Sequence, residues 1–174
     1  EWLRRAGEAG WETALGELER YWFDRAETLF TAGTCTADSM GLAARLFQQA
    51  AELGHRQAAL RFAQCLRNGL GVTRNSRAAL QWFSKASTLL DAKIALADML
   101  FFGEAGEPRL ADAFRWYVLA AQEGDDAYAM YSAGYCLLHG VGTEINSEQG
   151  LHWLNEAAVR GDADAQYELG CAYG

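Results

Sequence analysis

Three tryptophans recur along the chain at nearly constant spacing. Trp82, Trp116 and Trp153 are separated by 34 and 37 residues, and Leu46 lies 36 residues before Trp82. A glycine precedes each of these four positions by 13 residues, and an alanine follows each by four. The glycines are Gly33, Gly69, Gly103 and Gly140, and the alanines are Ala50, Ala86, Ala120 and Ala157. Because three independent features share one period, the chain is predicted to fold as stacked structural repeats.

Each repeat is predicted to contain two helices, helix A and helix B. In helix A, apolar positions at spacings of four, one and three, as in Ala58, Phe62, Ala63 and Leu66, lie on one helical face. A small residue after the large one is expected to let the neighbouring helix approach closely. These small residues are Ala63, Ala97, Gly134 and Gly170.

The helix ends are predicted from glycine, asparagine and aspartate. Gly69 and Gly140 close two A helices, because glycine adopts the left-handed backbone conformation at low cost. Asn75-Ser76 and Asn146-Ser147 follow at equal offsets, and either residue of each pair is a candidate cap of helix B. Aspartates after Gly124 and Gly161 are expected to cap the next A helices rather than bind a metal ion. They are Asp125, Asp126, Asp162 and Asp164.

Composition and charge narrow the function classes. Hydrophobic residues make up 51% of the 174 residues, which indicates a folded protein. The net charge of −8 argues against nucleic-acid and anionic-membrane partners, since both are bound mainly through Lys and Arg. No apolar run reaches the roughly 18 residues that span a bilayer, so direct membrane insertion is not expected.

The cysteines and histidines do not predict a metal site or catalysis. Cys35, Cys65, Cys136 and Cys171 form no Cys-x-x-Cys pair, and all four are expected to be buried or half-buried, with a Cys136–Cys171 bridge as the alternative. The glycine-rich turns lack the lysine of a phosphate-binding loop. No cofactor or metal is predicted. The histidines, which do not occur in a recurrent catalytic spacing, are His55, His139 and His152.

Three segments resemble the consensus of SEL-one-like repeats (SLR), which are related to tetratricopeptide repeats: Gly69–Val72, Trp153–Gly161 and Ala165–Tyr173. The resemblance implies an all-α fold, a right-handed α/α superhelix (solenoid) of helix–turn–helix repeats, and a bacterial source. The expected organisation is a single SLR solenoid over 1–174, an excerpt of a longer chain. Its parts are a partial repeat 1–10, repeats at about 11–54, 55–90, 91–124 and 125–161, and a partial repeat 162–174.

Two departures from the repeat pattern carry structural expectations. The 23 residues from Gly10 to Gly33 indicate either an extended helix A or an extra turn around Glu17 to Trp22. In the repeat containing Trp116, the segment 103–108 replaces the usual glycine turn. Pro108 is expected in the first turn of the helix that follows.

In solenoids of this type the A helices line the concave face, which is the usual binding groove. The inward-pointing positions are rich in aromatic residues, which dominate interface energetics. The alternative is that Tyr131, Tyr167 and one of Phe101 and Phe102 are packing residues. The predicted partner-binding residues are Gln64, Arg67, Asn68, Asp98, Phe101, Phe102, Tyr128, Tyr131, Tyr135, His139 and Tyr167.

The sequence therefore predicts a non-catalytic scaffold or adaptor that binds another protein or a peptide in this groove. Three alternatives are an immunity or inhibitor protein that blocks a toxin or effector enzyme, an enzyme with a site in the groove, and a spacer that binds nothing. The identity of the partner and the oligomeric state stay open. So does the compartment, which is either the bacterial envelope or periplasm, or the cytoplasm.

Overall fold

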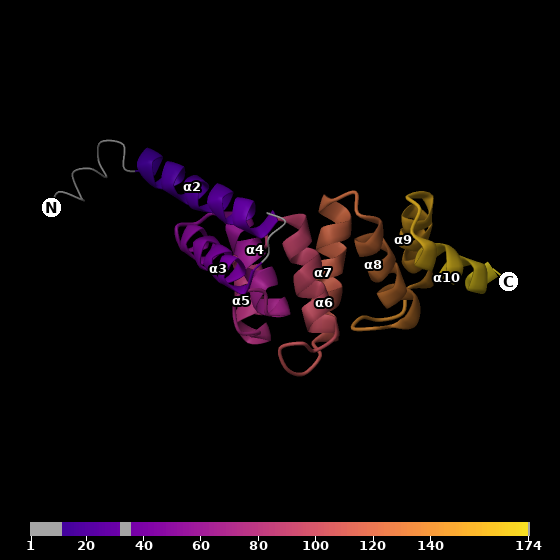
Figure 1. The fold of residues 1–174 in the computed structure, drawn as a ribbon. Helices are drawn as coiled ribbons and strands as arrows, with labels where there is room; N and C mark the ends of the chain where they lie inside the picture. Colours follow the sequence, from indigo (N-terminus) through magenta and orange to yellow (C-terminus); the bar gives the residue numbers. More distant parts are fainter. Residues whose placement is uncertain (1–11, 32–35, 174) are drawn as a thin grey trace. The chain divides into compact units, whose positions relative to one another are not determined.

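The computed structural model describes residues 12–31 and 36–173, which form nine α-helices and no strand. The main tertiary contacts within this part join helices that are consecutive along the chain, as in a solenoid. The predicted all-α solenoid of helix–turn–helix repeats is confirmed. The helices are α2 (Glu12–Thr31), α3 (Ala37–Glu52), α4 (Arg56–Asn68), α5 (Ser76–Lys85), α6 (Leu90–Phe101), α7 (Leu110–Glu123), α8 (Ala127–His139), α9 (Ser147–Val159) and α10 (Ala163–Tyr173) (Figure 1).

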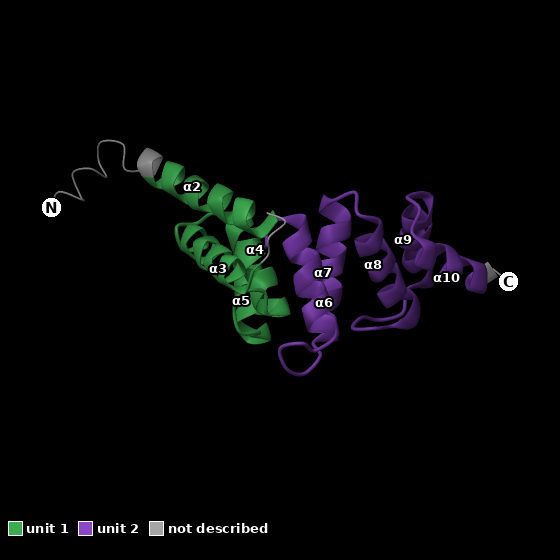
Figure 2. Cartoon of the chain, in the orientation of Figure 1, with its two compact units in different colours: residues 1–86 green, residues 87–174 purple. Residues whose placement is uncertain are grey.

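The chain divides into two compact units, residues 1–86 and residues 87–174 (Figure 2). The described part of unit 1 contains α2 to α5, and that of unit 2 contains α6 to α10. The even-numbered helices correspond to the predicted A helices and the odd-numbered ones to the B helices.

Short polar side chains cap the helices where the sequence predicted them. Asn75 and Asn146 accept hydrogen bonds from the backbone N–H groups three residues ahead, at 3.0 and 3.1 Å, so asparagine rather than serine is the cap. Asp126 and Asp162 do the same for α8 and α10, both at 2.8 Å. Each cap satisfies a donor that the helix leaves unpaired. The sequence did not predict that His55 caps α4 through Nδ1.

The glycine turns end two A helices and also contact the preceding repeat. Gly69 and Gly140 are left-handed, with φ of 74° and 68°, as predicted. The second glycine of each turn lies against backbone: a Cβ on Gly71 would be 2.2 Å from the Met40 carbonyl oxygen, and one on Gly142 would be 2.2 Å from that of Leu110. Only glycine fits there, a contact that the sequence pattern did not reveal.

The small residues of the A helices are close-approach positions where a following helix packs on them. Ala63 and Ala97 have no exposed surface. A Cβ on Gly134 would lie 2.9 Å from the Gly150 carbonyl oxygen of α9. Gly134 confirms the predicted close approach, and Ala63 and Ala97 are buried as it requires. Gly170 of α10 is exposed, with nothing within 4 Å of its Cβ position.

The structure selects one of the two alternatives for the first helix and corrects two other expectations from the sequence. The extended helix is the right alternative near Trp22, since α2 runs unbroken over 20 residues. Pro108 is not in the first turn of α7, because Arg109 is the N-cap of that helix. The N–H of Arg109 donates a hydrogen bond to the Leu100 carbonyl and so closes the turn.

Cys171 is exposed rather than buried, and it is not bridged to Cys136. Cys65 and Cys136 are buried as expected, whereas Cys35 lies outside the described residues.

Candidate functional site

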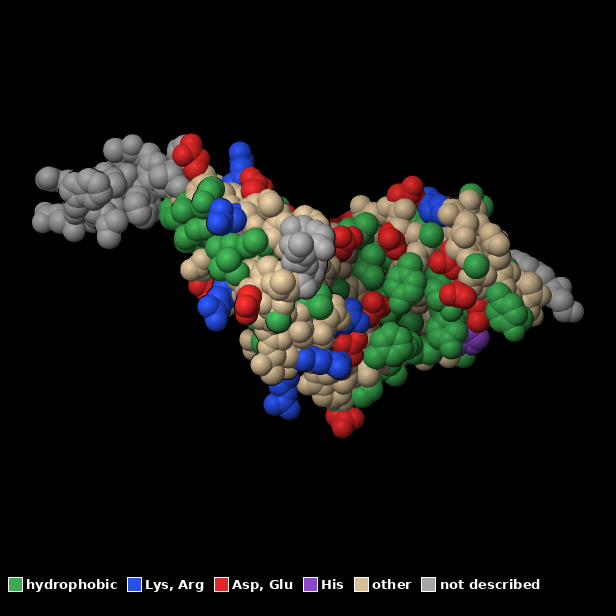
Figure 3. All heavy atoms as spheres, viewed as in Figure 1, with side chains coloured by type: hydrophobic (Ala, Val, Ile, Leu, Met, Phe, Trp, Pro, Cys, Tyr) green, Lys and Arg blue, Asp and Glu red, His purple; other side chains and the backbone are tan. Residues whose placement is uncertain are grey.

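Unit 2 contains an aromatic pocket between α6, α7 and α8, with a volume of about 250 Å³. Hydrophobic side chains gather on the visible face of α6 and α8, with acidic side chains among them (Figure 3). The residues that line this aromatic pocket are Phe101, Phe102, Tyr117, Tyr128, Tyr131, Ser132 and Tyr135.

Helical spacing places these side chains together. Tyr128, Tyr131 and Tyr135 are three and four residues apart, so they occupy one face of α8. Phe101 and Phe102 end α6, and their rings meet edge to face with centroids 5.1 Å apart. Phe102 keeps 65% of its surface exposed and adjoins the other aromatic rings of the pocket, so it belongs to a contiguous exposed apolar patch of the kind that marks interaction sites.

Asp98 organises one wall of the pocket from α6. Its Oδ1 accepts hydrogen bonds from the hydroxyl groups of Tyr117 at 2.8 Å and Tyr128 at 3.0 Å. Burial, and then the charge of Asp98, raise the pKa of both tyrosines. Both hydroxyls therefore stay protonated near neutral pH and act as hydrogen-bond donors to the carboxylate.

Acidic side chains of α10 lie near the tyrosines of α8. Burial raises the pKa of Tyr131 to about 12, with further contributions from the charges of Asp164 and Glu168. Glu168 lies 3.2 Å from Nε2 of His139, whose ring is 4.4 Å from that of Tyr135. The α8 tyrosines therefore have carboxylates of both α6 and α10 in their surroundings.

The structure brings together most of the site residues predicted in unit 2. Phe101, Phe102, Tyr128, Tyr131 and Tyr135 line the pocket, as described above. Asp98 and His139 contact the lining tyrosines, whereas Tyr167 is 71% exposed and lines no part of it.

Sequence reasoning missed Tyr117 and Ser132. Tyr117 directly follows the anchor Trp116, where the other repeats have Phe83 and Leu154. A tyrosine at a buried apolar position needs a hydrogen-bond acceptor, and that requirement was the available signal. Ser132, between Tyr131 and Ala133, carried no such signal.

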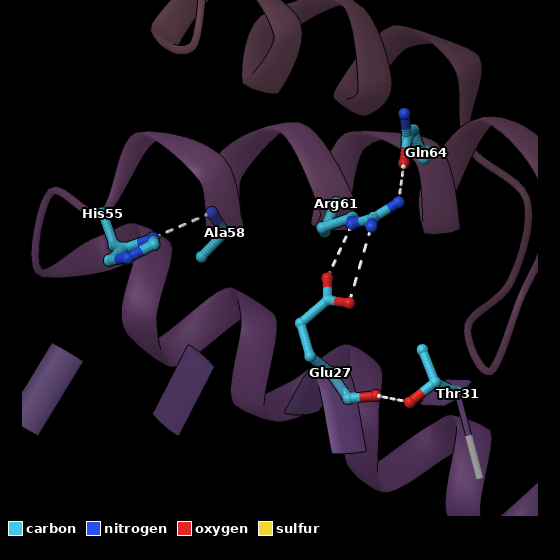
Figure 4. Close-up of polar contacts among 6 residues, drawn as sticks. All are labelled: Glu27, Thr31, His55, Ala58, Arg61 and Gln64. Atoms are coloured by element: carbon cyan, nitrogen blue, oxygen red, sulfur yellow. Dashed lines mark hydrogen bonds and ion pairs between the residues drawn. The ribbon is translucent and has the colours of Figure 1, made fainter. Parts of the chain in front are cut away.

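The predicted residues of unit 1 lie on α4. Gln64 accepts a hydrogen bond of 3.4 Å from Arg61, and Arg61 forms an ion pair of 2.6 Å with Glu27 of α2 (Figure 4). Arg67 is half-buried, and Asn68 is exposed. These residues belong to unit 1 and the aromatic pocket belongs to unit 2, so a groove that includes both sets stays a prediction.

Two further properties of the described residues bear on function. No group of three or more His, Cys, Asp or Glu side chains is arranged to hold a metal ion in residues 12–31 and 36–173. Within the same ranges no helix combines the length and the apolar character needed to cross a bilayer.

Stacked helix pairs and an open aromatic pocket define a helical-repeat protein of the solenoid class. The Sel1 repeat model matches residues 32–55, 56–89, 90–125, 127–162 and 163–174, so the chain belongs to the Sel1 repeat family. Proteins of this family are generally non-enzymatic scaffolds that bind other proteins.

Three relatives illustrate this membership. Chitin synthase regulatory factor 2 of Schizosaccharomyces pombe is 32% identical over 136 residues, which are 72% of this chain and 26% of that protein. A Sel1 repeat protein from Oxalobacter formigenes has a TM-score of 0.76 and 25% identity, covering 99% of this chain and 67% of the other. An immunity protein from Pseudomonas aeruginosa has a TM-score of 0.55 and 25% identity, covering 89% and 58%. The chain thus spans about a quarter of the length of this fungal relative.

Proposed function

We propose that the chain is a non-catalytic interaction scaffold and that it binds another protein or a peptide at the aromatic pocket of unit 2. The observation that carries this proposal is the exposure of Phe102, 65%, beside a pocket lined by five other aromatic rings. Aromatic residues clustered in a partly desolvated pocket are typical hot spots of protein interfaces.

The size of the pocket favours a side chain of a partner over a free small molecule. Small-molecule sites commonly have volumes of roughly 300–1,000 Å³. The aromatic pocket, at about 250 Å³, is below that range and open to solvent. It suits one anchoring side chain of a larger ligand whose remainder lies along the surface.

The histidines of the described chain favour binding over catalysis. His55 is occupied as a helix cap, His139 pairs with Glu168 beside Tyr135, and His152 lies against the ring of Trp153. None of the three is hydrogen-bonded to a described serine or cysteine that it would activate as a nucleophile. We therefore assign no reaction to this surface.

A second candidate function is that of an immunity protein that blocks a toxin or effector enzyme. The likeness to the immunity protein of Pseudomonas aeruginosa favours it. An immunity protein is itself a binding scaffold, so both candidates require a protein-binding surface, and the same variants test that surface.

Selection of peptides from a random displayed library tests the proposal. Selected peptides would be titrated into the purified chain and into the Phe102→Ala and Tyr135→Ala variants. Loss of a hot spot costs about 2 kcal/mol, so Phe102→Ala is expected to raise the dissociation constant by roughly 30-fold.

The control is Val159→Ala on α9, because Val159 is 85% exposed and lines no part of the pocket. Circular dichroism verifies that each variant keeps its helices. Selected peptides that bind Phe102→Ala, Tyr135→Ala and the control variant equally well would show that the pocket is not the binding surface.

A further inference from the structure

Charge is divided unequally between the two units. Residues 87–174 contain 14 Asp and Glu residues and four Lys and Arg residues, a formal charge of −10. Residues 1–86 contain nine acidic and 11 basic residues, a formal charge of +2. The net charge of −8 therefore arises entirely from unit 2, the unit that contains the aromatic pocket.

Each basic side chain of unit 2 is paired with a carboxylate of the same unit. Lys93 pairs with Glu123, and Arg160 pairs with Asp125 and Glu156. Arg109 and Arg115 both lie near Asp112, with nitrogen–oxygen distances of 2.5 and 3.7 Å. None of the four pairs with Asp98, Asp164 or Glu168, so these carboxylates have no Lys or Arg of unit 2 as a counterion, and among the described residues Glu168 has only the His139 ring beside it.

Carboxylates of two helices lie near the pocket. On α6, Asp98 accepts both of its tyrosine hydrogen bonds through Oδ1, and Oδ2 has no hydrogen bond to any described residue. On α10, Glu168 lies 3.2 Å from His139, whose ring is 4.4 Å from that of the lining residue Tyr135. The charges of Glu168 and Asp164 also contribute to the raised pKa of Tyr131. The walls of the pocket are mainly aromatic rings.

We propose that the aromatic pocket takes an arginine side chain from a basic segment of the partner protein. The inference rests on the proposed function and specifies the chemistry of the partner. A guanidinium group is planar, stacks on aromatic faces, and donates several hydrogen bonds to carboxylates. The flat aromatic walls and the flanking carboxylates of this pocket match both properties.

A wholly apolar anchor suits the pocket less well. Its burial would remove water from Asp98 and from the carboxylates of α10 without supplying a donor in exchange, and an unpaired buried charge is costly. An acidic anchor would be repelled by the charge of −10 on unit 2. An arginine both fills the cavity and neutralises the carboxylates.

Three synthetic peptides of equal length test the inference. They carry arginine, citrulline or leucine at the centre, flanked by glycine and leucine residues. Citrulline has the shape of arginine without its charge. Each peptide is titrated into the ¹⁵N-labelled chain, and the amide resonances of α6 and α8 report binding at the pocket. Dissociation constants are measured at low and at high salt.

The matched variants are Asp98→Asn and Glu168→Gln. The asparagine keeps a carbonyl oxygen that accepts from Tyr117 and Tyr128, so it removes the charge while conserving the hydrogen bonds. The control is Glu148→Gln on α9, which removes one charge from a helix that contributes no lining residue.

The arginine peptide is expected to bind about fivefold more tightly than the citrulline and leucine peptides, which corresponds to an ion pair of about 1 kcal/mol. High salt is expected to abolish most of that preference, and so is the double variant that combines Asp98→Asn with Glu168→Gln. The control Glu148→Gln is expected to preserve the preference. Equal affinity of the leucine and arginine peptides at the same resonances overturns the arginine assignment but leaves the pocket as a binding site.

Absence of any shift at α6 and α8 with all three peptides, even at millimolar concentration, also overturns the arginine assignment. The proposed function is judged separately, because it depends on the library-selected peptides and their response to Phe102→Ala.

Discussion

Tyr117 donates a hydrogen bond of 2.8 Å to Asp98, which ties α7 to α6 across 19 residues of sequence. Only 2% of the surface of Tyr117 is exposed, so water is a poor substitute for Asp98 as the partner of its hydroxyl. This hydrogen bond fixes the ring of Tyr117 as a wall of the aromatic pocket and holds the Asp98 carboxylate at the edge of the pocket.

Tyr117→Phe is expected to lower the free energy of unfolding by about 1 kcal/mol, the usual net value of a buried hydrogen bond. Tyr128 still donates to Asp98, so the carboxylate is not left without a partner. Urea denaturation followed by tryptophan fluorescence measures the change. Tyr167→Phe removes a hydroxyl from a side chain that is 71% exposed and serves as the control. Equal stabilities of the two variants would contradict a structural role for the Tyr117–Asp98 hydrogen bond.

Two glycines at one repeat position are expected to respond to alanine with opposite signs. At Gly134 the added Cβ would lie 2.9 Å from the Gly150 carbonyl oxygen and 2.9 Å from Leu154 Cγ. Overpacking costs about 1–3 kcal/mol, more than the roughly 0.5–1 kcal/mol that alanine gains over glycine in a helix. Gly134→Ala should therefore destabilise the chain. Gly170→Ala, with nothing within 4 Å, should stabilise it slightly. Thermal unfolding of both variants measures the difference, and a stabilising Gly134→Ala would disprove the close packing of α8 on α9.

The same two glycines show how far sequence reasoning reaches. Periodicity correctly predicted the helix pairs, the asparagine and aspartate caps and the close approach at Gly134, because each depends on a local spacing that recurs between repeats. Periodicity gives Gly134 and Gly170 the same role. They differ because α9 packs on Gly134, whereas α10, which carries Gly170, is the last helix that the structure describes.

The residues of the candidate site could likewise be predicted from the sequence only in part. Phe101, Phe102 and Tyr135 stood out because they depart from the repeated residues, whereas Tyr131 recurs as Tyr167 in the next repeat. Tyr117 was missed because it occupies a helix B position that is apolar elsewhere, and only the location of Asp98 explains it. The unequal charge of the two units could be counted only after the structure had supplied the boundary at residue 86.

In unit 1, the pair of Arg61 and Glu27 joins helices whose residues are 34 positions apart. The guanidinium contacts both carboxylate oxygens, at 2.6 and 3.5 Å, with the two side chains 35% and 24% exposed. A double-mutant cycle with Glu27→Gln and Arg61→Met is expected to give a coupling energy of no more than about 1 kcal/mol, because partial exposure screens the pair. The coupling energy should be smaller still in high salt. A coupling that salt does not change would mean that packing, not charge, connects the two helices.

The buried thiol of Cys136 is expected to make the stability of the chain fall as the pH becomes alkaline. Burial raises the pKa of its thiol from 9.0 to about 11. Between these values the unfolded thiol has lost its proton while the folded one keeps it, so stability is full below about pH 9 and falls as pH rises toward 11. In Cys136→Ala that contribution to the slope disappears, although the missing sulfur lowers stability at every pH. Urea titrations of both proteins from pH 8 to pH 11 measure the slopes. Parallel curves would show that the buried thiol ionises alike in both states, since the remaining titrating groups are shared.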